Sequence, residues 1–186
     1  MNRPTEPRKK EIILEKCLAT AIETGTLGSS INQIAKKIGT SSRMLVYHFG
    51  SKSELERQTI SLLEMHLQEK LQLFQSLEIQ EAKRPVEPFL AIWEHLTSAD
   101  MCGLLKLTME LQQRAIQGDL ETKLFLEKEN KKWISILSQM LNNQDVAISL
   151  LYLFQGAIID FLTTGKAENG RRAIMIFFTN LNLSKE

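Results

Sequence analysis

The segment from Ser30 to Lys52, SINQIAKKIGTSSRMLVYHFGSK, constrains the fold of this chain more than any other stretch. Its first half carries apolar residues at i, i+3, i+4 and i+7, a spacing typical of one helix face: Ile31, Ile34, Ala35 and Ile38. Ser30 and Gln33 have the spacing of a capping box, and Gly39 suits the left-handed conformation that ends many helices. The pattern predicts two short helices joined by a tight turn.

The second of these helices is predicted to run from about Ser42 to Phe49, with Thr40 or Ser41 as its cap. A helix of this length is not stable alone, so Leu45 and Phe49 at i, i+4 must anchor it to a core. The other large side chains would then face outward: Arg43, Met44, Tyr47 and His48. A helix with this pattern suits the major groove of DNA better than a protein core.

The longer stretch SINQIAKKIGTSSRMLVYHFGSKSEL resembles the DNA-binding helix-turn-helix of the tetracycline-repressor (TetR/AcrR) family of bacterial transcriptional regulators. The resemblance covers about residues 8 to 58. It is carried by nine positions: Ile34, Ala35, Gly39, Ser41, His48, Phe49, Ser51, Lys52 and Leu55. Val46 stands where most members have a Tyr that usually contacts a phosphate, and an aromatic follows at Tyr47. The phosphate contact is expected either to pass to Tyr47 or to be lost.

Seven residues are candidates for contacting DNA: Ser41, Ser42, Arg43, Met44, Tyr47, His48 and Lys52. Arg43 is expected to read a base edge, because arginine binds guanine O6 and N7 in the major groove. The others are expected mainly at phosphates, with Met44 and Tyr47 also able to meet thymine methyls. Lys52 precedes a predicted helix that starts at a second capping box, Ser51 with Glu54, where a bound phosphate would balance its charge.

The helical periodicity predicts an all-α chain, and the resemblance implies how it is divided. Residues 1–50 would form a three-helix helix-turn-helix head, and residues 51–186 a six-helix body for ligand binding and dimerisation. The implied function is a sequence-specific regulator, usually a repressor, of a pseudo-palindromic double-stranded DNA operator, released by an unknown small-molecule effector. The alternative is a helical small-molecule-binding or interaction protein whose head does not read DNA. Val46, in place of the usual Tyr, would then indicate the lost DNA contact.

The body contains candidate ligand-binding residues: Trp93, Met109, Phe125 and Gln155. An aromatic and methionine stripe at helical spacing is more often core, so both interpretations stay open for each residue. Asp100 is expected to cap a helix that runs to about Ile116. A charged stretch within the predicted helix from Leu120 to Leu141 is expected to form a solvated face: Glu127, Lys128, Glu129, Lys131 and Lys132.

Two predicted helices near the end of the chain, Asp145 to Thr164 and Arg171 to Leu181, are apolar on more than one face. Such helices need burial on both sides, which predicts a homodimer through this eighth and ninth helix. Polar residues interrupt the first of them well before the roughly 18 apolar residues that a membrane span needs. We therefore expect no membrane partner.

Charge is distributed unevenly along the 186 residues. Residues 1–55 hold nine Lys/Arg and five Asp/Glu, a net +4, and the remainder holds 14 and 17, a net −3, which together give the overall +1. A basic head on an acidic body fits a protein whose head alone meets phosphate, although chance would also produce so small an asymmetry. Cys17 and Cys102 lack metal-like spacing and are expected as free thiols in the cytoplasm. The N-terminus has no apolar signal-peptide region.

The sequence contains no recognisable catalytic motif. His48, His66 and His95 are isolated from plausible partners, and the sequence has neither HExxH nor CxxC spacing. It also lacks a glycine-rich phosphate loop and a GxSxG elbow. We therefore expect no enzyme activity, no cofactor and no metal.

Overall fold

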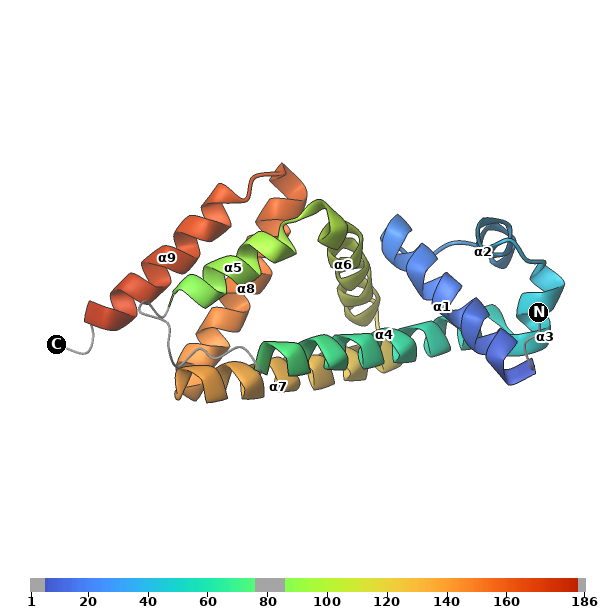
Figure 1. Cartoon of the computed structure of the whole chain (residues 1–186), viewed down its shortest axis with the longest axis horizontal. Coiled ribbons are helices and arrows are strands. Elements are labelled where there is room, and N and C mark those ends of the chain that lie inside the picture. Colours follow the sequence, from blue (N-terminus) through green and yellow to red (C-terminus); the bar gives the residue numbers. More distant parts are fainter. Residues whose placement is uncertain (1–5, 76–85, 184–186) are drawn as a thin grey trace. The chain divides into compact units, whose positions relative to one another are not determined.

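The computed structural model describes residues 6–75 and 86–183, and the described part is all-α, as predicted (Figure 1). These residues contain no strand. The helices are α1 (Glu6–Thr24), α2 (Ile31–Ile38), α3 (Ser42–Phe49), α4 (Lys52–Gln75), α5 (Glu87–Leu96), the 3-10 helix η2 (Ala99–Met101), α6 (Cys102–Ile116), α7 (Leu120–Leu141), α8 (Gln144–Thr164) and α9 (Glu168–Leu183).

The chain divides into two compact units, Met1–Ser76 and Leu77–Glu186. Helices α1 to α4 lie in the first unit, and α5 to α9 lie in the second. Each unit has its own apolar core.

The first unit is built around the two short helices α2 and α3. Ser30 and Gln33 form the predicted capping box, with Ser30 N donating to Gln33 Oε1 at 2.7 Å and Gln33 N donating to Ser30 Oγ at 3.3 Å. Gly39 ends α2 at φ 72°, a left-handed conformation that costs a glycine little. The core joins residues of four helices: Cys17, Ile34, Ala35, Ile38, Leu45, Phe49 and Leu55.

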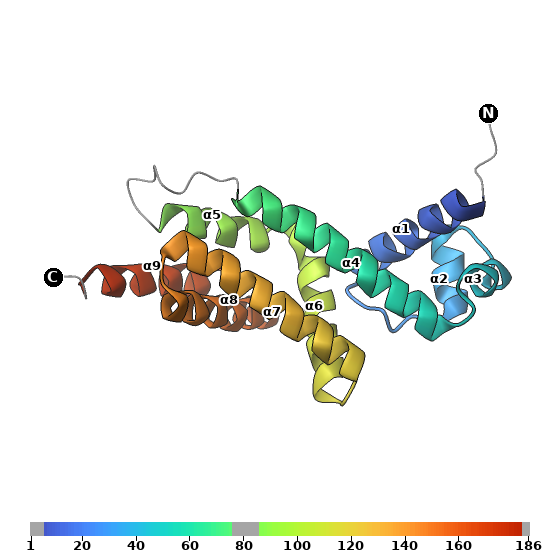
Figure 2. The same cartoon turned by 90° about the horizontal axis from the view of Figure 1, so that it is seen from below.

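The second unit packs α8 between α7 and α9, with α5 against α9 (Figure 2). Its core is aliphatic and aromatic: Phe89, Trp93, Leu137, Ala147, Leu150, Leu151, Ile174 and Phe178. Phe89 of α5 stacks on Phe178 of α9 with ring centroids 4.8 Å apart. Asn143 caps α8 by accepting from the backbone N–H groups of Asp145 and Val146.

Three local predictions need correction. Asp100 does not cap α6, because it lies inside η2, and Met101 occupies the N-cap position without a side-chain bond. The predicted box at the start of α4 is half formed: Ser51 Oγ accepts from Glu54 N at 3.1 Å, but the Glu54 carboxylate binds Arg57 and Gln58 instead.

Glu129 is the third correction, because it is buried rather than on the solvated face predicted for its charged stretch. It follows the buried residues Thr122 and Phe125 by seven and four positions, so it lies on the same inward side of α7. Glu127, Lys128 and Lys131 are exposed, as predicted, whereas Lys132 is half-buried.

Candidate nucleic-acid interface

Helix α3 is short, and three features of the sequence hold it in place. Leu45 is completely buried and Phe49 nearly so, which anchors one side of the helix in the first unit. At its start, Ser41 Oγ accepts from Met44 N at 3.2 Å and satisfies one of the free N–H groups of the first turn. Ser42 Oγ also donates to Asn32 Oδ1, which ties α3 to α2.

The opposite side of α3 presents polar and aromatic side chains to solvent. Arg43, Met44 and Tyr47 are exposed, as expected from the periodicity, and Tyr47 leaves 70% of its surface accessible. Val46 is exposed as well, so the position that carries Tyr in most members of the resembled family lies on the same outer surface. The predicted residue Ser41 is also exposed, while Ser42 is half-buried. These residues lie on α3 or directly before it.

His48 differs from the outward orientation that the periodicity predicted, because it is half-buried. His48 follows Leu45 by three residues, almost one helical turn, so it lies beside the buried stripe of Leu45 and Phe49. Its ring meets Tyr47 edge-on at 5.1 Å between centroids, and among the described residues its buried Nε2 has no hydrogen-bond partner.

Lys52 stands at the start of α4, in an ion pair. Its Nζ lies 3.0 Å from Glu56 Oε1, and 41% of its side chain is exposed. To contact a DNA phosphate, the Lys52 ammonium would therefore have to leave Glu56 or bind both groups at once. Nearby, hydrogen bonds from Arg57 and Gln58 lower the pKa of Glu54 to about 2, so Glu54 is ionised at neutral pH.

Two exposed lysines in the last turn of α2, Lys36 and Lys37, were not among the predicted site residues. The signal for them was present, because both lie off the apolar stripe of α2. At the N-terminus of α1, the hydrogen bond from Lys9 to Glu6 is the main cause that lowers the pKa of Glu6.

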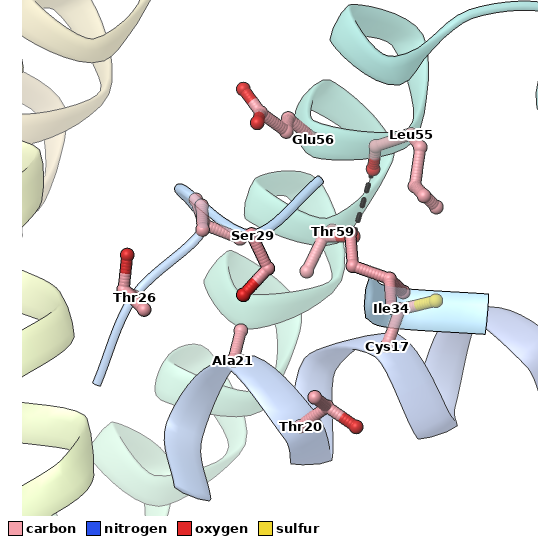
Figure 3. A pocket seen from close by; sticks show the side chains of 10 residues that line it. Cys17, Thr20, Ala21, Thr26, Ser29, Ile34, Leu55, Glu56 and Thr59 are labelled. Carbon is pink, nitrogen blue, oxygen red and sulfur yellow. Dashed lines mark hydrogen bonds between the residues drawn. The ribbon is translucent and has the colours of Figure 1, made fainter. Parts of the chain in front are cut away.

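A small hollow with a cavity volume of about 20 Å³, open to solvent, lies between α1, the α1–α2 connection and α4 (Figure 3). Small and apolar side chains dominate its lining, and Thr59 Oγ1 within it donates to Leu55 O at 2.8 Å. Burial raises the pKa of the Cys17 thiol to about 11, so this lining residue is protonated and a weak nucleophile at neutral pH. No group of three His, Cys, Asp or Glu side chains that could hold a metal ion occurs among the residues described.

The four predicted ligand residues of the second unit have different surroundings. Trp93 is buried, and its indole N–H donates to Ala167 O at 3.0 Å. Gln155 Nε2 donates to Asn130 Oδ1 at 3.0 Å, which links α8 to α7. Phe125 is buried and Met109 half-buried. These positions fit a core as well as a pocket lining, so the ligand assignment stays a prediction.

Helix α8 also has the length and composition of a membrane-spanning helix, a property that core helices of soluble proteins share. In the single chain it leaves Tyr152 and Ile159 exposed, and α9 leaves Met175 and Ile176 exposed. The predicted apolar excess of these two helices is therefore present on their surface.

Part of the first unit matches a family model. Residues 13–58 match the family model described as bacterial regulatory proteins, tetR family. No curated protein matches the chain.

Solved structures share the fold of nearly the whole chain. A TetR transcription regulator from Haloarcula marismortui ATCC 43049 has a TM-score of 0.74 at 14% identity, covering 92% of this chain and 97% of its own. A transcriptional regulator from Rhodococcus sp. Rha1 has a TM-score of 0.70 at 19% identity, covering 91% and 94%. Salmonella enterica GusR has a TM-score of 0.67 at 21% identity, covering 97% of each chain.

Proposed function

We propose, from the match of residues 13–58 to the family model described as bacterial regulatory proteins, tetR family, that the chain is a transcriptional repressor released by a small molecule. In this proposal residues 1–50 read DNA, and residues 51–186 bind the ligand and a second copy of the chain. The observation that carries it is the surface of α3, where Arg43, Met44 and Tyr47 are exposed while Leu45 and Phe49 hold the helix in place.

The proposed site on DNA is a pseudo-palindrome read by two copies of α3. A dimer places one such helix in each of two major grooves, about 34–36 Å apart or a multiple of that distance. Arg43 is the proposed reader of a base edge, and Ser41, Ser42, Tyr47, His48 and Lys52 are proposed mainly for phosphates, with Met44 and Tyr47 at thymine methyls. Because His48 is half-buried, only part of its side chain is open to a phosphate.

The proposed dimer interface consists of the exposed apolar surface of α8 and α9. Tyr152 and Ile159 lie seven residues apart on one side of α8, with Gly156 between them. A Cβ at Gly156 would have nothing within 4 Å, so a second helix has room to approach closely there. Burying this apolar surface between two subunits would remove it from water, which favours dimerisation.

For a small-molecule effector to release the protein from DNA, it must bind one conformation of the dimer better than another. A ligand that prefers the conformation with misplaced recognition helices weakens DNA binding by its difference in affinity between the two. Trp93, Met109, Phe125 and Gln155 remain the proposed ligand-contacting residues.

The proposal is tested with purified protein and duplexes tiling the intergenic DNA upstream of its own gene. Fluorescence anisotropy at two salt concentrations, with a scrambled duplex as control, should show selective, salt-dependent binding of two chains to one pseudo-palindrome. Binding no better than to the scrambled duplex, persisting after unfolding and refolding to strip a bound ligand, would contradict it. That result would favour a helical ligand-binding or interaction protein, in which the exposed Val46 leaves the head unable to read DNA.

A further inference from the structure

The place where α6 ends and α7 begins carries an exposed apolar surface that the proposed function does not use. Ile116, the last residue of α6, leaves 85% of its surface accessible, and Leu120 and Leu124 at the start of α7 leave 71% and 66%. Three of the four most exposed large apolar residues in the described part of the chain therefore lie here, the fourth being Tyr47. Single exposed apolar residues are ordinary, but a group of them marks an interaction surface. We call these three residues the α6–α7 corner.

The outward orientation of the corner is set by local contacts within α7. Asp119 caps the helix, with its Oδ1 accepting from Thr122 N at 3.2 Å and its Oδ2 accepting from Thr122 Oγ1 at 2.8 Å. Thr122 and Phe125 are buried, which fixes the inner side of this end of the helix. Leu120 and Leu124, four residues apart, share the opposite side. The apolar surface is thus held in place before any partner arrives, which lowers the entropy cost of binding one.

Charged side chains of both signs surround the apolar residues. Over the first nine residues of α7, two acidic and two basic side chains are exposed: Glu121, Lys123, Glu127 and Lys128. In the part of the chain that the structure describes, neither Lys123 nor Glu127 belongs to a salt bridge. A polyanion or an anionic membrane would select a basic border, and a basic partner would select an acidic one. A border with equal numbers of each sign instead complements a surface of the same composition.

We propose that the α6–α7 corner binds the same corner of a second copy of the chain, which joins two of the proposed dimers. A two-fold contact requires a surface that complements itself. If two α7 helices pack antiparallel about an axis level with Phe125, Lys123 of each copy lies opposite Glu127 of the other, because both positions are two residues from the axis. The two Leu124 side chains then meet near the centre of the contact, within this charged border.

The contact is weaker than the proposed α8–α9 interface, because its apolar part consists of only three residues from each copy. In dilute solution the dimers therefore remain separate. Two dimers held on neighbouring operators have a much higher effective concentration, and the same contact then makes their binding to DNA cooperative. This cooperativity rests on the proposed function, whereas the contact between two corners does not.

Sedimentation velocity of the full-length protein without DNA tests the contact. The wild-type protein should double its mass with a Kd between about 10 µM and 1 mM. Leu124→Asp should weaken this doubling at least about tenfold, because it places a carboxylate at the apolar centre. Met65→Asp is the matched control: Met65 lies on α4 with 57% of its surface exposed, and its substitution should leave the doubling unchanged.

A charge swap tests the antiparallel arrangement. Lys123→Glu should weaken the doubling, because two acidic groups then face each other across the contact. Adding Glu127→Lys to the same chain should restore it, because each copy again presents opposite charges to the other. Circular dichroism reports whether the variants fold. Should Leu124→Asp not fold, Leu120→Asp takes its place, since an acidic residue is favourable in the first turn of a helix.

Three results would overturn the proposal: no doubling of the wild-type protein up to about 1 mM, an unchanged doubling in Leu124→Asp, or a charge swap that does not restore it. The doubling is read from whichever species exists in dilute solution. A protein that passes from monomer to dimer through the corner lacks the α8–α9 dimer but keeps this contact. One that stays a dimer at every concentration keeps the α8–α9 dimer and lacks this contact.

Discussion

Arg43 and Lys52 differ in what they are expected to contribute to DNA binding. Arg43 is exposed on α3, whereas Lys52 is paired with Glu56 at the start of α4. Arg43→Ala should therefore relax the preference at one base pair by about 1–3 kcal/mol, because it removes a base contact. Lys52→Ala should weaken all sequences alike and lower the salt slope by about one, because it removes a phosphate contact.

Anisotropy titrations of both variants against single-base-pair operator variants, at several salt concentrations, measure both effects. Lys128→Ala, an exposed lysine of the second unit, is the control for loss of a surface charge. If Arg43→Ala weakened every duplex equally, its role as a base reader would be refuted.

Gly170 in the first turn of α9 is required by a contact that only the folded chain makes. A Cβ there would lie 2.2 Å from Trp93 Cζ2, and the Trp93 indole is held by its bond to Ala167 O. Gly170→Ala should lower the free energy of unfolding by about 1–3 kcal/mol, as overpacking in cores does. Urea denaturation followed by circular dichroism measures the loss.

The Gly170 prediction has an internal check in a double-mutant cycle. Trp93→Phe removes the ring atoms that the new methyl group would meet, so the two substitutions should be less damaging together than the sum of their single effects. Additive effects would show that the clash is relieved by movement of the backbone instead.

At the scale of an element, α3 depends on Ser41 both for its cap and, in the proposed complex, for a phosphate contact. Ser41→Ala should lower stability by about 1 kcal/mol, because Met44 N loses its acceptor. Asn and Asp also cap helices, so Ser41→Asn and Ser41→Asp should retain most of the stability. Only Ser41→Asp adds a negative charge beside the phosphates, and it should abolish DNA binding.

Thermal unfolding and anisotropy on the same three variants separate the two roles of Ser41. DNA affinity of Ser41→Asp equal to that of Ser41→Asn would place this residue away from the phosphates. A large loss of stability in Ser41→Asn would show that the cap needs the geometry of the hydroxyl.

For the whole molecule, the proposed dimer predicts opposite outcomes for apolar surface residues in different places. Ile159 on α8 and Ile116 at the end of α6 are both exposed in the single chain, to 50% and 85%. Ile159→Asp should weaken dimerisation at least about 100-fold, because it buries an unpaired charge between the subunits. Ile116→Asp lies outside the proposed interface and should leave the dimer intact.

Sedimentation velocity over a range of concentrations measures this difference. Operator affinity should fall together with dimerisation, because a dimer gains from binding two half-sites at once. A fully dimeric Ile159→Asp would exclude this surface of α8 as the interface.

Local features of the chain were predictable where the interactions that create them span only a few residues. The bounds of α2 and α3, the Ser30–Gln33 box and the left-handed Gly39 all follow from contacts within one or two turns. The outer surface of α3 was predictable for the same reason, since two anchors four residues apart determine which side faces solvent. Family resemblance over this segment was confirmed by the match at residues 13–58.

Sequence periodicity was therefore enough to predict an all-α chain, the bounds of α2 and α3, and an apolar excess on the last two helices. Contacts between distant parts of the chain cannot be predicted in this way: the indole of Trp93 donates to Ala167 O, 74 residues away, and Gly170 lies against the same ring. The burial of Glu129 beside exposed Glu127 and Lys128, and the half-burial of His48, depend on such contacts as well. The physical reason is that these features depend on which helix faces meet, and residues far apart in the sequence settle that jointly.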